Sequence, residues 1–244
     1  MSTERKDLAN IKAVIFDYGL VLVRSPTREE FQRMAQMFSV SFKVFYQLWE
    51  SSRNVYDRGD ISADQYWLAL AAQANALIDP EQIKSLRKTE VEIWSHPDPE
   101  MLNWVSELQR SGIKTGILSN MPLDLAAHVR TDGHWMKSFD FKTLSAEVRM
   151  IKPDPAIYEH TLRGLGVSAL ETLFLDDREP NVRAARALGI HAIQFSSIER
   201  LKTDLERFGF PMLPTVTQSS SPVSNTGSEE NPEGLPGQEV KFQL

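Results

Sequence analysis

A short run of apolar residues from Ala13 to Phe16 ends at Asp17, and this pattern predicts a buried strand whose carboxyl end carries an acid. Gly19 follows two residues later and lets the backbone turn close to whatever Asp17 holds. Ligands of open α/β sheets bind at the carboxyl ends of the strands, so Asp17 is a candidate functional group. The alternative is a turn-forming aspartate that only ends the strand.

From residue 25 to residue 95 the apolar positions recur at helical spacing, and no strand pattern intervenes. We expect one of these helices to run from about Ser41 to Val55. Capping signals mark other helix starts at Thr27 with Glu30, at Ser62 with Gln65 and at Asp79-Pro80. We therefore predict a small all-helical insertion whose aromatic residues form a core.

After residue 96 strand and helix patterns alternate. The expected strands are 114–118, 139–144, 172–175 and 190–195, and the expected helices are 98–111, 122–130, 155–165, 180–188 and one that ends near 207. This order predicts a Rossmann-like parallel sheet with helices on both faces, built from residues 11–24 and 96–210, with 25–95 as an inserted helical cap. Residues 211–244 are rich in Pro, Ser, Gly and Glu, so we expect a disordered tail.

The amino-acid composition limits the kinds of partner that the protein can bind. The 244 residues are 41% hydrophobic and 25% charged, which is typical of a soluble globular protein. A net charge of −6 argues against a broad surface for nucleic acid or an anionic membrane, but leaves room for a local phosphate pocket. With no cysteine, the chain has no disulfide and no thiolate chemistry. The polar first ten residues and the lack of a long apolar run favour the cytoplasm. The sequence does not predict the oligomeric state.

Three further strand ends carry polar groups, and each has a structural alternative. Ser119-Asn120 can receive phosphate oxygens or cap a helix. Lys152 is a candidate cation or a solvated surface charge. The carboxylates of Asp176 and Asp177 repel each other unless a cation lies between them, so this pair predicts a Mg²⁺ site or a helix cap.

These groups, in this order along residues 11–208, resemble the phosphatases of the haloacid dehalogenase superfamily that carry a small helical cap. The resemblance rests on the stretches FDYGLVL, ILSN, IKPDPAIY and FLDDREPNVRAARALGI. The pattern from Arg58 to Ser62 is similar to the cap of the bacterial branch related to α-glucose-1-phosphatase.

The resemblance implies a role for each residue. Asp17 would be the nucleophile that forms an aspartyl-phosphate, and it would share Mg²⁺ with the Gly19 carbonyl and Asp177. Asp176 would act through water or support these ligands. Ser119 and Asn120 would hold phosphate oxygens, and Lys152 would neutralise charge between the nucleophile and the phosphoryl group. Asn181 would brace the last loop. The weaker candidates for substrate contact from the cap are Tyr56, Asp57 and Arg58.

One position departs from the family pattern. The family's usual phosphatases carry a second aspartate two residues after the nucleophile, as the general acid for the leaving oxygen, and this chain has Gly19 there. Leu20 is also larger than the usual next residue. None of the five histidines (His96, His128, His134, His160 and His191) lies in a motif that would replace the acid.

The sequence therefore predicts a Mg²⁺-dependent phosphatase of small phosphate monoesters, with sugar phosphates as one candidate class. The first alternative is a hydrolytic 2-haloacid dehalogenase of the same fold, against which the pair Asp176-Asp177 argues. The second is a non-catalytic phosphate-binding or scaffold protein, which has no need of Asp17, Lys152 and Asp177 together.

Overall fold

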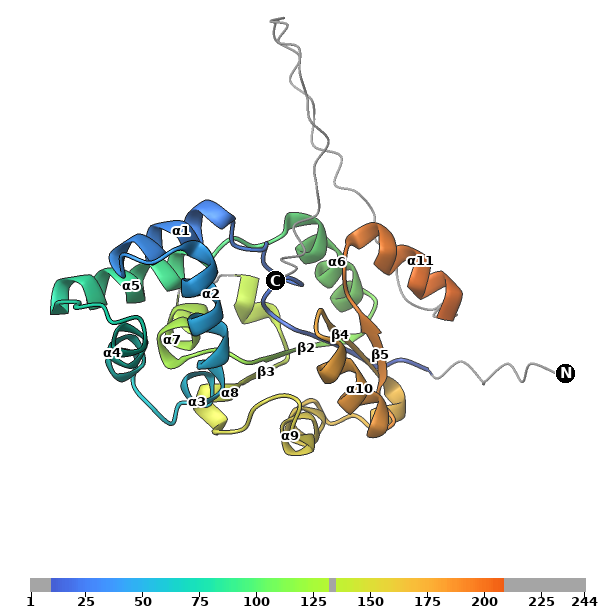
Figure 1. Ribbon diagram of the computed structural model, residues 1–244. Helices are drawn as coiled ribbons and strands as arrows, with labels where there is room; N and C mark the ends of the chain where they lie inside the picture. The colour runs from blue at the N-terminus through green and yellow to red at the C-terminus, as the bar shows by residue number, and fades with distance from the viewer. Residues whose placement is uncertain (1–9, 132–134, 209–244) are drawn as a thin grey trace, which may run out of the picture.

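The computed structural model describes residues 10–131 and 135–208, so the tail predicted over 211–244 lies outside the described residues. Five parallel strands form one sheet in the order β3-β2-β1-β4-β5 (Figure 1). Their bounds are β1 Ala13–Phe16, β2 Lys114–Ser119, β3 Phe141–Leu144, β4 Thr172–Asp176 and β5 His191–Gln194. This arrangement confirms the predicted Rossmann-like α/β fold.

Helices cover both faces of the sheet. They are α6 Pro99–Arg110, α7 Leu123–Thr131, α8 Ser145–Val148, α9 Pro155–Leu165, α10 Glu179–Ala187 and α11 Ile198–Phe208. Val14 and Phe16 of β1 face an apolar cluster that includes residues of α6, α7 and α11. Ala13 and Ile15 face the opposite cluster, which includes residues of α9 and α10. Successive strand residues point to opposite faces, so the two-sided burial explains why β1 is a continuous apolar run.

The segment between β1 and α6 contains five helices, which we call the helical insertion: α1 Arg28–Met37, α2 Phe42–Ser51, α3 Arg53–Asp57, α4 Ala63–Gln73 and α5 Pro80–Ile93. The capping boxes predicted at Thr27 and Ser62 are present, and Asp79 caps α5 through the backbone N–H of Gln82. The helix expected over 41–55 is divided at Ser52, whose hydroxyl donates to the carbonyl of Leu48.

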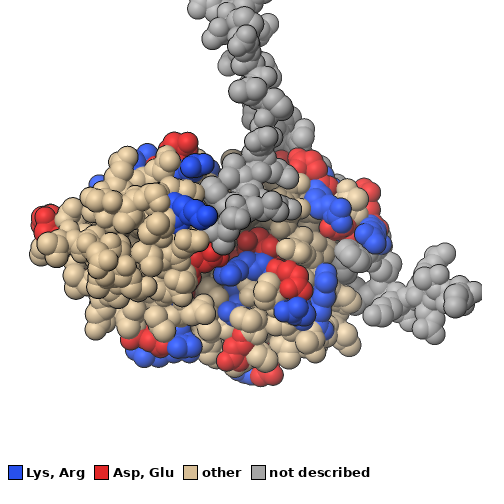
Figure 2. Space-filling model, in the orientation of Figure 1, with Lys and Arg blue, Asp and Glu red and all other residues tan. Residues whose placement is uncertain are grey.

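The helical insertion has an apolar core of its own. Phe31, Trp49, Tyr66 and Trp67 are among its buried members, which confirms the prediction that the aromatic residues are core. In the view of Figure 2 the surface of the insertion is largely without charge, whereas charged side chains gather over the α/β part. No helix in the described part of the chain is both long and apolar enough to cross a membrane.

Candidate active site

The candidate site lies at the carboxyl edge of the sheet, where β1, β2 and β4 end side by side. Phe16 pairs with Ile117 on one side and with Leu175 on the other, so the next residues of these strands come to the same edge. The backbone N–H of Asp17 donates to the carbonyl of Leu175 at 2.8 Å. Strand register thus brings Asp17, Ser119 and Asp176 to one edge, as the sequence predicted.

Lys152 crosses from the loop before α9 to meet these acids. Its Nζ lies 2.9 Å from Oδ1 of Asp17 and 2.6 Å from Oδ2 of Asp176, and the side chain is buried. Burial alone would lower the pKa of the Lys152 ammonium, but Asp17 and Asp176 outweigh it and raise that pKa above its usual value. Lys152 therefore stays charged and neutralises part of the acidic cluster.

Asn120 holds Lys152 in place. The Asn120 amide donates to the carbonyl of Lys152 at 3.0 Å, and its Oδ1 accepts from the N–H of Lys152 at 2.8 Å. These two bonds hold the carboxamide against the backbone of the lysine loop, and the contact between Asn120 and phosphate stays a prediction. The neighbouring Ser119 is buried at the end of β2.

Asp176 is fully enclosed by donors. Its Oδ1 accepts from the backbone N–H of Arg178 at 2.8 Å and from Nδ2 of Asn181 at 2.9 Å, while Oδ2 accepts from Lys152. The carbonyl of Asn181 in turn accepts from the hydroxyl of Tyr158 at 3.0 Å. A carboxylate with this many partners is suited to support the site, and the indirect role of Asp176 stays a prediction.

Three carboxylates share this small volume. One oxygen from each of Asp17, Asp176 and Asp177 lies within 4.8 Å of the others. Burial raises the pKa of Asp17 to about 8, against the pull of Lys152, and burial with the charge of Asp176 raises the pKa of Asp177 to about 6. One ammonium cannot offset three carboxylates, and hard oxygen donors are the ligands of Mg²⁺, so these residues fit a divalent cation.

Gly19 begins the loop that follows Asp17. A Cβ atom built on Gly19 would lie 3.0 Å from Cζ3 of Trp94, at the junction of the helical insertion with α6. Leu20 follows in the left-handed region, with φ of 63°, and is 36% exposed. The role of the Gly19 carbonyl as a metal ligand remains a prediction.

The contacts predicted from the helical insertion need correction at Tyr56. This side chain is 1% exposed, its hydroxyl donates to Glu90 at 3.0 Å and its ring stacks on Tyr66 at 4.1 Å. Tyr56 therefore belongs to the core of the insertion and is not placed to touch a substrate. Arg58 is partly exposed and bonds to Asp60 at 2.7 Å, so the structure shows it engaged within its own turn.

Asp57 is also turned inward. Its carboxylate forms an ion pair with Arg53 at 2.6 Å, and burial raises the pKa of Asp57 in spite of this pairing. Its backbone carbonyl accepts a hydrogen bond from the hydroxyl of Ser145 in α8. The same hydroxyl accepts from the N–H of Met121 at 2.9 Å, which links the insertion to the loop after β2. No motif in the sequence marked Ser145.

Tyr46 is a second residue that the sequence did not single out. It lies on α2, is partly buried, and its phenol has a raised pKa because of burial and the charge of Glu50. The charge of Arg178 lowers the pKa of this phenol and the charge of Asp177 raises it, both by less than burial does. In the sequence its aromatic neighbours at helical spacing predicted only a core position.

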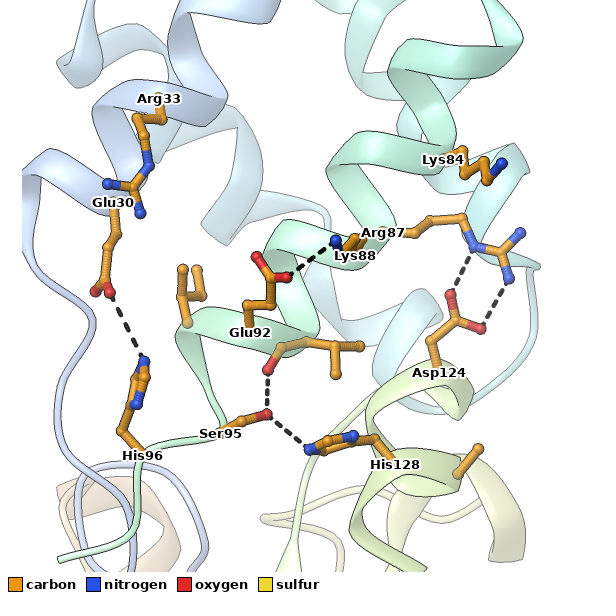
Figure 3. Close-up of a pocket in the computed structure, with 13 residues that line it drawn as sticks. Glu30, Arg33, Lys84, Arg87, Lys88, Glu92, Ser95, His96, Asp124 and His128 are labelled. Carbon is orange, nitrogen blue, oxygen red and sulfur yellow. Dashed lines mark hydrogen bonds and ion pairs between the residues drawn. The ribbon is translucent and has the colours of Figure 1, made fainter. Parts of the chain in front are cut away.

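A cavity of about 900 Å³ lies between α1, α5 and α7 (Figure 3). Arg87 of α5 is bonded there to Asp124 of α7 at 2.6 Å, and Ser95 to His128 at 2.9 Å. None of Asp17, Ser119, Lys152, Asp176 and Asp177 lines this cavity. It is therefore a feature of the junction between the insertion and α7, separate from the carboxylate cluster.

Comparison with known proteins identifies the family to which the chain is similar. Residues 11–189 match the family model of the haloacid dehalogenase-like hydrolases. The sesquiterpene phosphatase astK of Aspergillus oryzae is 31% identical over 180 residues, which cover 73% of this chain and 87% of that protein. Matches to mouse acyl-CoA dehydrogenase family member 10 and rat bifunctional epoxide hydrolase 2 cover only 11% and 16% of those longer proteins.

Solved structures share the fold. The had family enzyme bt-2542 of Bacteroides thetaiotaomicron, in complex with magnesium and inorganic phosphate, superposes with a TM-score of 0.62 at 21% identity, over 76% of this chain and 94% of that one. The L-2-haloacid dehalogenase RSc1362 superposes with a TM-score of 0.60 at 23% identity, over 75% of this chain and 85% of that one. At these identities the likeness extends to the fold alone.

Proposed function

The chain belongs to the haloacid dehalogenase-like hydrolases, and we propose that within this family it is a Mg²⁺-dependent phosphatase of small phosphate monoesters. The observation that carries the proposal is the joint placement of Asp17, Lys152 and Asp177 at one edge of the sheet. This set offers a nucleophile, a charge-neutralising cation and an oxygen ligand for a metal.

In the proposed reaction an oxygen of the Asp17 carboxylate attacks phosphorus. The bond from phosphorus to the ester oxygen breaks, and the leaving oxygen keeps the electron pair of that bond and takes a proton from water, because Gly19 supplies no acid. Water then attacks the aspartyl-phosphate, which releases inorganic phosphate and restores the Asp17 carboxylate. The ammonium of Lys152, 2.9 Å from Asp17, lowers the repulsion between this anion and the phosphoryl group.

The carboxylates of Asp17 and Asp177 and the carbonyl of Gly19 would hold the Mg²⁺ ion. When bound, Mg²⁺ would supply positive charge against the phosphoryl oxygens and keep Asp17 ionised in spite of its burial. Asp176 would hold Lys152 and the loop of Arg178 in position. The Ser119 hydroxyl and the backbone N–H of Asn120 would bind phosphate oxygens, whereas the N–H of Met121 is bonded to Ser145.

We further propose that residues 25–95 act as a cap over the α/β core of residues 11–24 and 96–210. Two observations support this division: the helical insertion has its own apolar cluster, and the Ser145 hydroxyl joins the carbonyl of Asp57 in the insertion to the N–H of Met121 in the loop after β2. The pattern from Arg58 to Ser62 keeps sugar phosphates among the candidate substrates, and the relative named as a sesquiterpene phosphatase adds terpenyl phosphates.

A dehalogenase is the second candidate, because Gly19 removes the acid that usual phosphatases of the family carry. Both activities use an aspartate nucleophile, so the metal separates them. The assay is the hydrolysis of an aryl phosphate by the full chain with Mg²⁺ or with a chelator, next to the release of halide from a 2-haloacid. We expect phosphate release that the chelator abolishes.

Asp17→Asn tests the nucleophile, because an amide neither attacks phosphorus nor supplies an anionic ligand. We expect a loss of at least about 10³-fold in kcat/KM. Asp79→Asn is the matched control: Asp79 is an exposed cap of α5, and asparagine caps a helix equally well. Activity of Asp17→Asn close to that of Asp79→Asn would refute the assignment.

A further inference from the structure

The Cα atom of Gly19 faces the benzo edge of the Trp94 indole. A Cβ atom at Gly19 would lie 3.0 Å from Cζ3 and 3.6 Å from both Cε3 and Cη2 of that ring. All three are carbon atoms. A side chain at position 19 would therefore start directly against a hydrocarbon surface, and even a methyl group would have to shift the indole by a few tenths of an ångström.

Trp94 is held by the same segment that carries Gly19. The hydroxyl of Tyr18 donates to the carbonyl of Trp94 at 2.8 Å. Beyond it the chain pairs with the loop after β1, because Arg24 N–H donates to the carbonyl of His96 and Asp98 N–H to the carbonyl of Leu22, both at 2.9 Å. The Trp94 side chain packs against the apolar clusters of both the α/β core and the insertion, and it stays partly exposed.

We propose that Trp94 is a specificity-determining residue that forms an apolar wall on the leaving-group side of the site. This inference rests on the proposed function. The family resemblance places a proton-donating carboxylic acid at position 19, next to the leaving oxygen. In this chain a side chain at position 19 would point at the benzo edge of the Trp94 indole, whose carbon atoms have no acidic proton. Contact between this edge and an apolar group removes both from water and stabilises the bound ester. The site therefore selects phosphate monoesters with an apolar leaving group.

The test compares octyl phosphate with ethyl phosphate. The two leaving alcohols have nearly the same acidity, so the ratio of their kcat/KM values reports contact with the chain beyond the ester oxygen. We expect the native protein to favour octyl phosphate and Trp94→Ala to reduce that ratio by about 10-fold, the usual effect of truncating an aromatic contact. Trp94→Phe, which keeps an aromatic ring, is expected to retain most of the preference.

Gly19→Ala probes the contact from the other side. Its methyl group displaces the indole, so we expect the octyl preference to fall here too, with no additional fall when it is combined with Trp94→Ala. Leu170→Ala is the matched control, because Leu170 is an apolar residue 64% exposed just before β4, at the opposite edge of the sheet. Its ratio should equal that of the native protein.

Two results separate the failure of this inference from the failure of the proposed function. If Mg²⁺-dependent hydrolysis of both esters occurs and the ratio is the same in the native protein, Trp94→Ala and Gly19→Ala, the role of Trp94 is overturned and the phosphatase stands. If the native protein hydrolyses neither these esters nor an aryl phosphate, the role of Trp94 and the phosphatase activity are both refuted. Inhibition by inorganic phosphate verifies that each variant has kept its phosphate site, and Trp94→Phe and Gly19→Ala carry the test if Trp94→Ala does not fold.

Discussion

At the scale of single residues, the site is a set of buried charges that depend on one another. Lys152 is 3% exposed and Asp176 is fully buried, and each is the other's closest ionic partner. Removing one partner of a buried pair leaves an uncompensated charge, whereas removing both does not. The pair therefore offers a way to separate the contribution of charge balance to folding from its contribution to catalysis.

We expect Lys152→Gln to lower the free energy of unfolding by about 3–5 kcal/mol, because Asp17 and Asp176 then face each other without a cation. The double variant Lys152→Gln with Asp176→Asn should recover part of that stability but none of the phosphatase activity. Urea unfolding and aryl phosphate hydrolysis measure the two effects. Lys12→Gln breaks only the exposed pair with Glu171 and should cost about 0–1 kcal/mol. Equal losses for Lys152→Gln and Lys12→Gln would contradict this view.

The absence of a general acid at Gly19 leads to a second prediction, about how the rate depends on the leaving group. Without a proton donor the leaving oxygen departs with more negative charge, so log kcat/KM should fall steeply as the leaving-group pKa rises. Gly19→Asp alone should recover little, since Trp94 occupies the path of the new side chain. Gly19→Asp with Trp94→Ala should gain on alkyl phosphates, by up to the roughly 10²–10⁴-fold that general acids supply. A shallow slope in the native protein would indicate a proton donor elsewhere.

Single residues also show what a sequence can predict of a site. Asp17, Ser119 and Asp176 were predictable because each ends an apolar run, and parallel strands end at one edge. Lys152 was predictable only by resemblance, because nothing local distinguishes it from a surface lysine. Trp94 was not found, because its contact with Gly19 joins residues 75 positions apart in the chain and leaves no spacing signal.

At the scale of elements, the helical insertion meets the α/β part at α8. Ser145 donates to the carbonyl of Asp57 and accepts from the N–H of Met121, so one hydroxyl joins the end of α3 to the loop after Ser119. Gly59 lies against the same helix: its φ is 76°, and a Cβ atom there would be 2.8 Å from the carbonyl oxygen of Ala146. This turn accepts only glycine without a shift of the backbone.

Two glycines in the left-handed region test this contact. Gly59→Ala and Gly112→Ala both force alanine to a positive φ, which costs about 1 kcal/mol, but nothing lies within 4 Å of a Cβ atom at Gly112. We expect Gly112→Ala to lower only the thermal midpoint. Gly59→Ala should in addition lower kcat/KM and speed amide exchange over residues 53–60, since it pushes the turn off α8. Indistinguishable effects of the two variants on kcat/KM would refute a functional contact.

Element boundaries were predictable where side chains satisfy backbone groups locally. Thr27 and Ser62 form the capping boxes that the sequence indicated, and α9 has the predicted bounds because proline starts it and Gly166 ends it. The division between α2 and α3 was missed because both helices share one apolar stripe. The helix α8 is too short for a periodic pattern, and packing between distant segments fixes it.

At the scale of the whole molecule, the apolar clusters on the two faces of the sheet share its strands, whereas the cluster of the insertion is joined to them by two passages of the chain. The chain enters the insertion after β1 and returns before α6, and the salt bridges from Arg87 to Asp64 and Asp124 span the insertion and α7. The fold was predictable because alternating strands and helices admit few parallel topologies. The way the insertion rests on the core was not, because it depends on single contacts such as Ser145 with Asp57.

The stability of the whole protein should carry the signature of the acidic cluster. Burial raises the pKa of Asp17 from 3.8 to about 8 and that of Asp177 to about 6. Between about pH 4 and pH 8 the folded protein therefore binds more protons than the unfolded chain, and the free energy of unfolding falls as the pH rises. Mg²⁺ binds the deprotonated carboxylates, so it opposes this loss and stabilises more strongly at high pH.

We expect the thermal midpoint of the metal-free protein to be lower at pH 8 than at pH 5.5, and excess Mg²⁺ to raise it more at pH 8. Calorimetry with chelator or Mg²⁺ at both pH values measures this. Asp17→Asn removes the group with the larger shift, so its midpoint should depend less on pH and respond less to Mg²⁺. Asp79→Asn keeps the acidic cluster and should behave like the native protein. A Mg²⁺ effect equal at the two pH values, or undiminished in Asp17→Asn, would mean that the cation does not bind where Asp17, Asp176 and Asp177 meet.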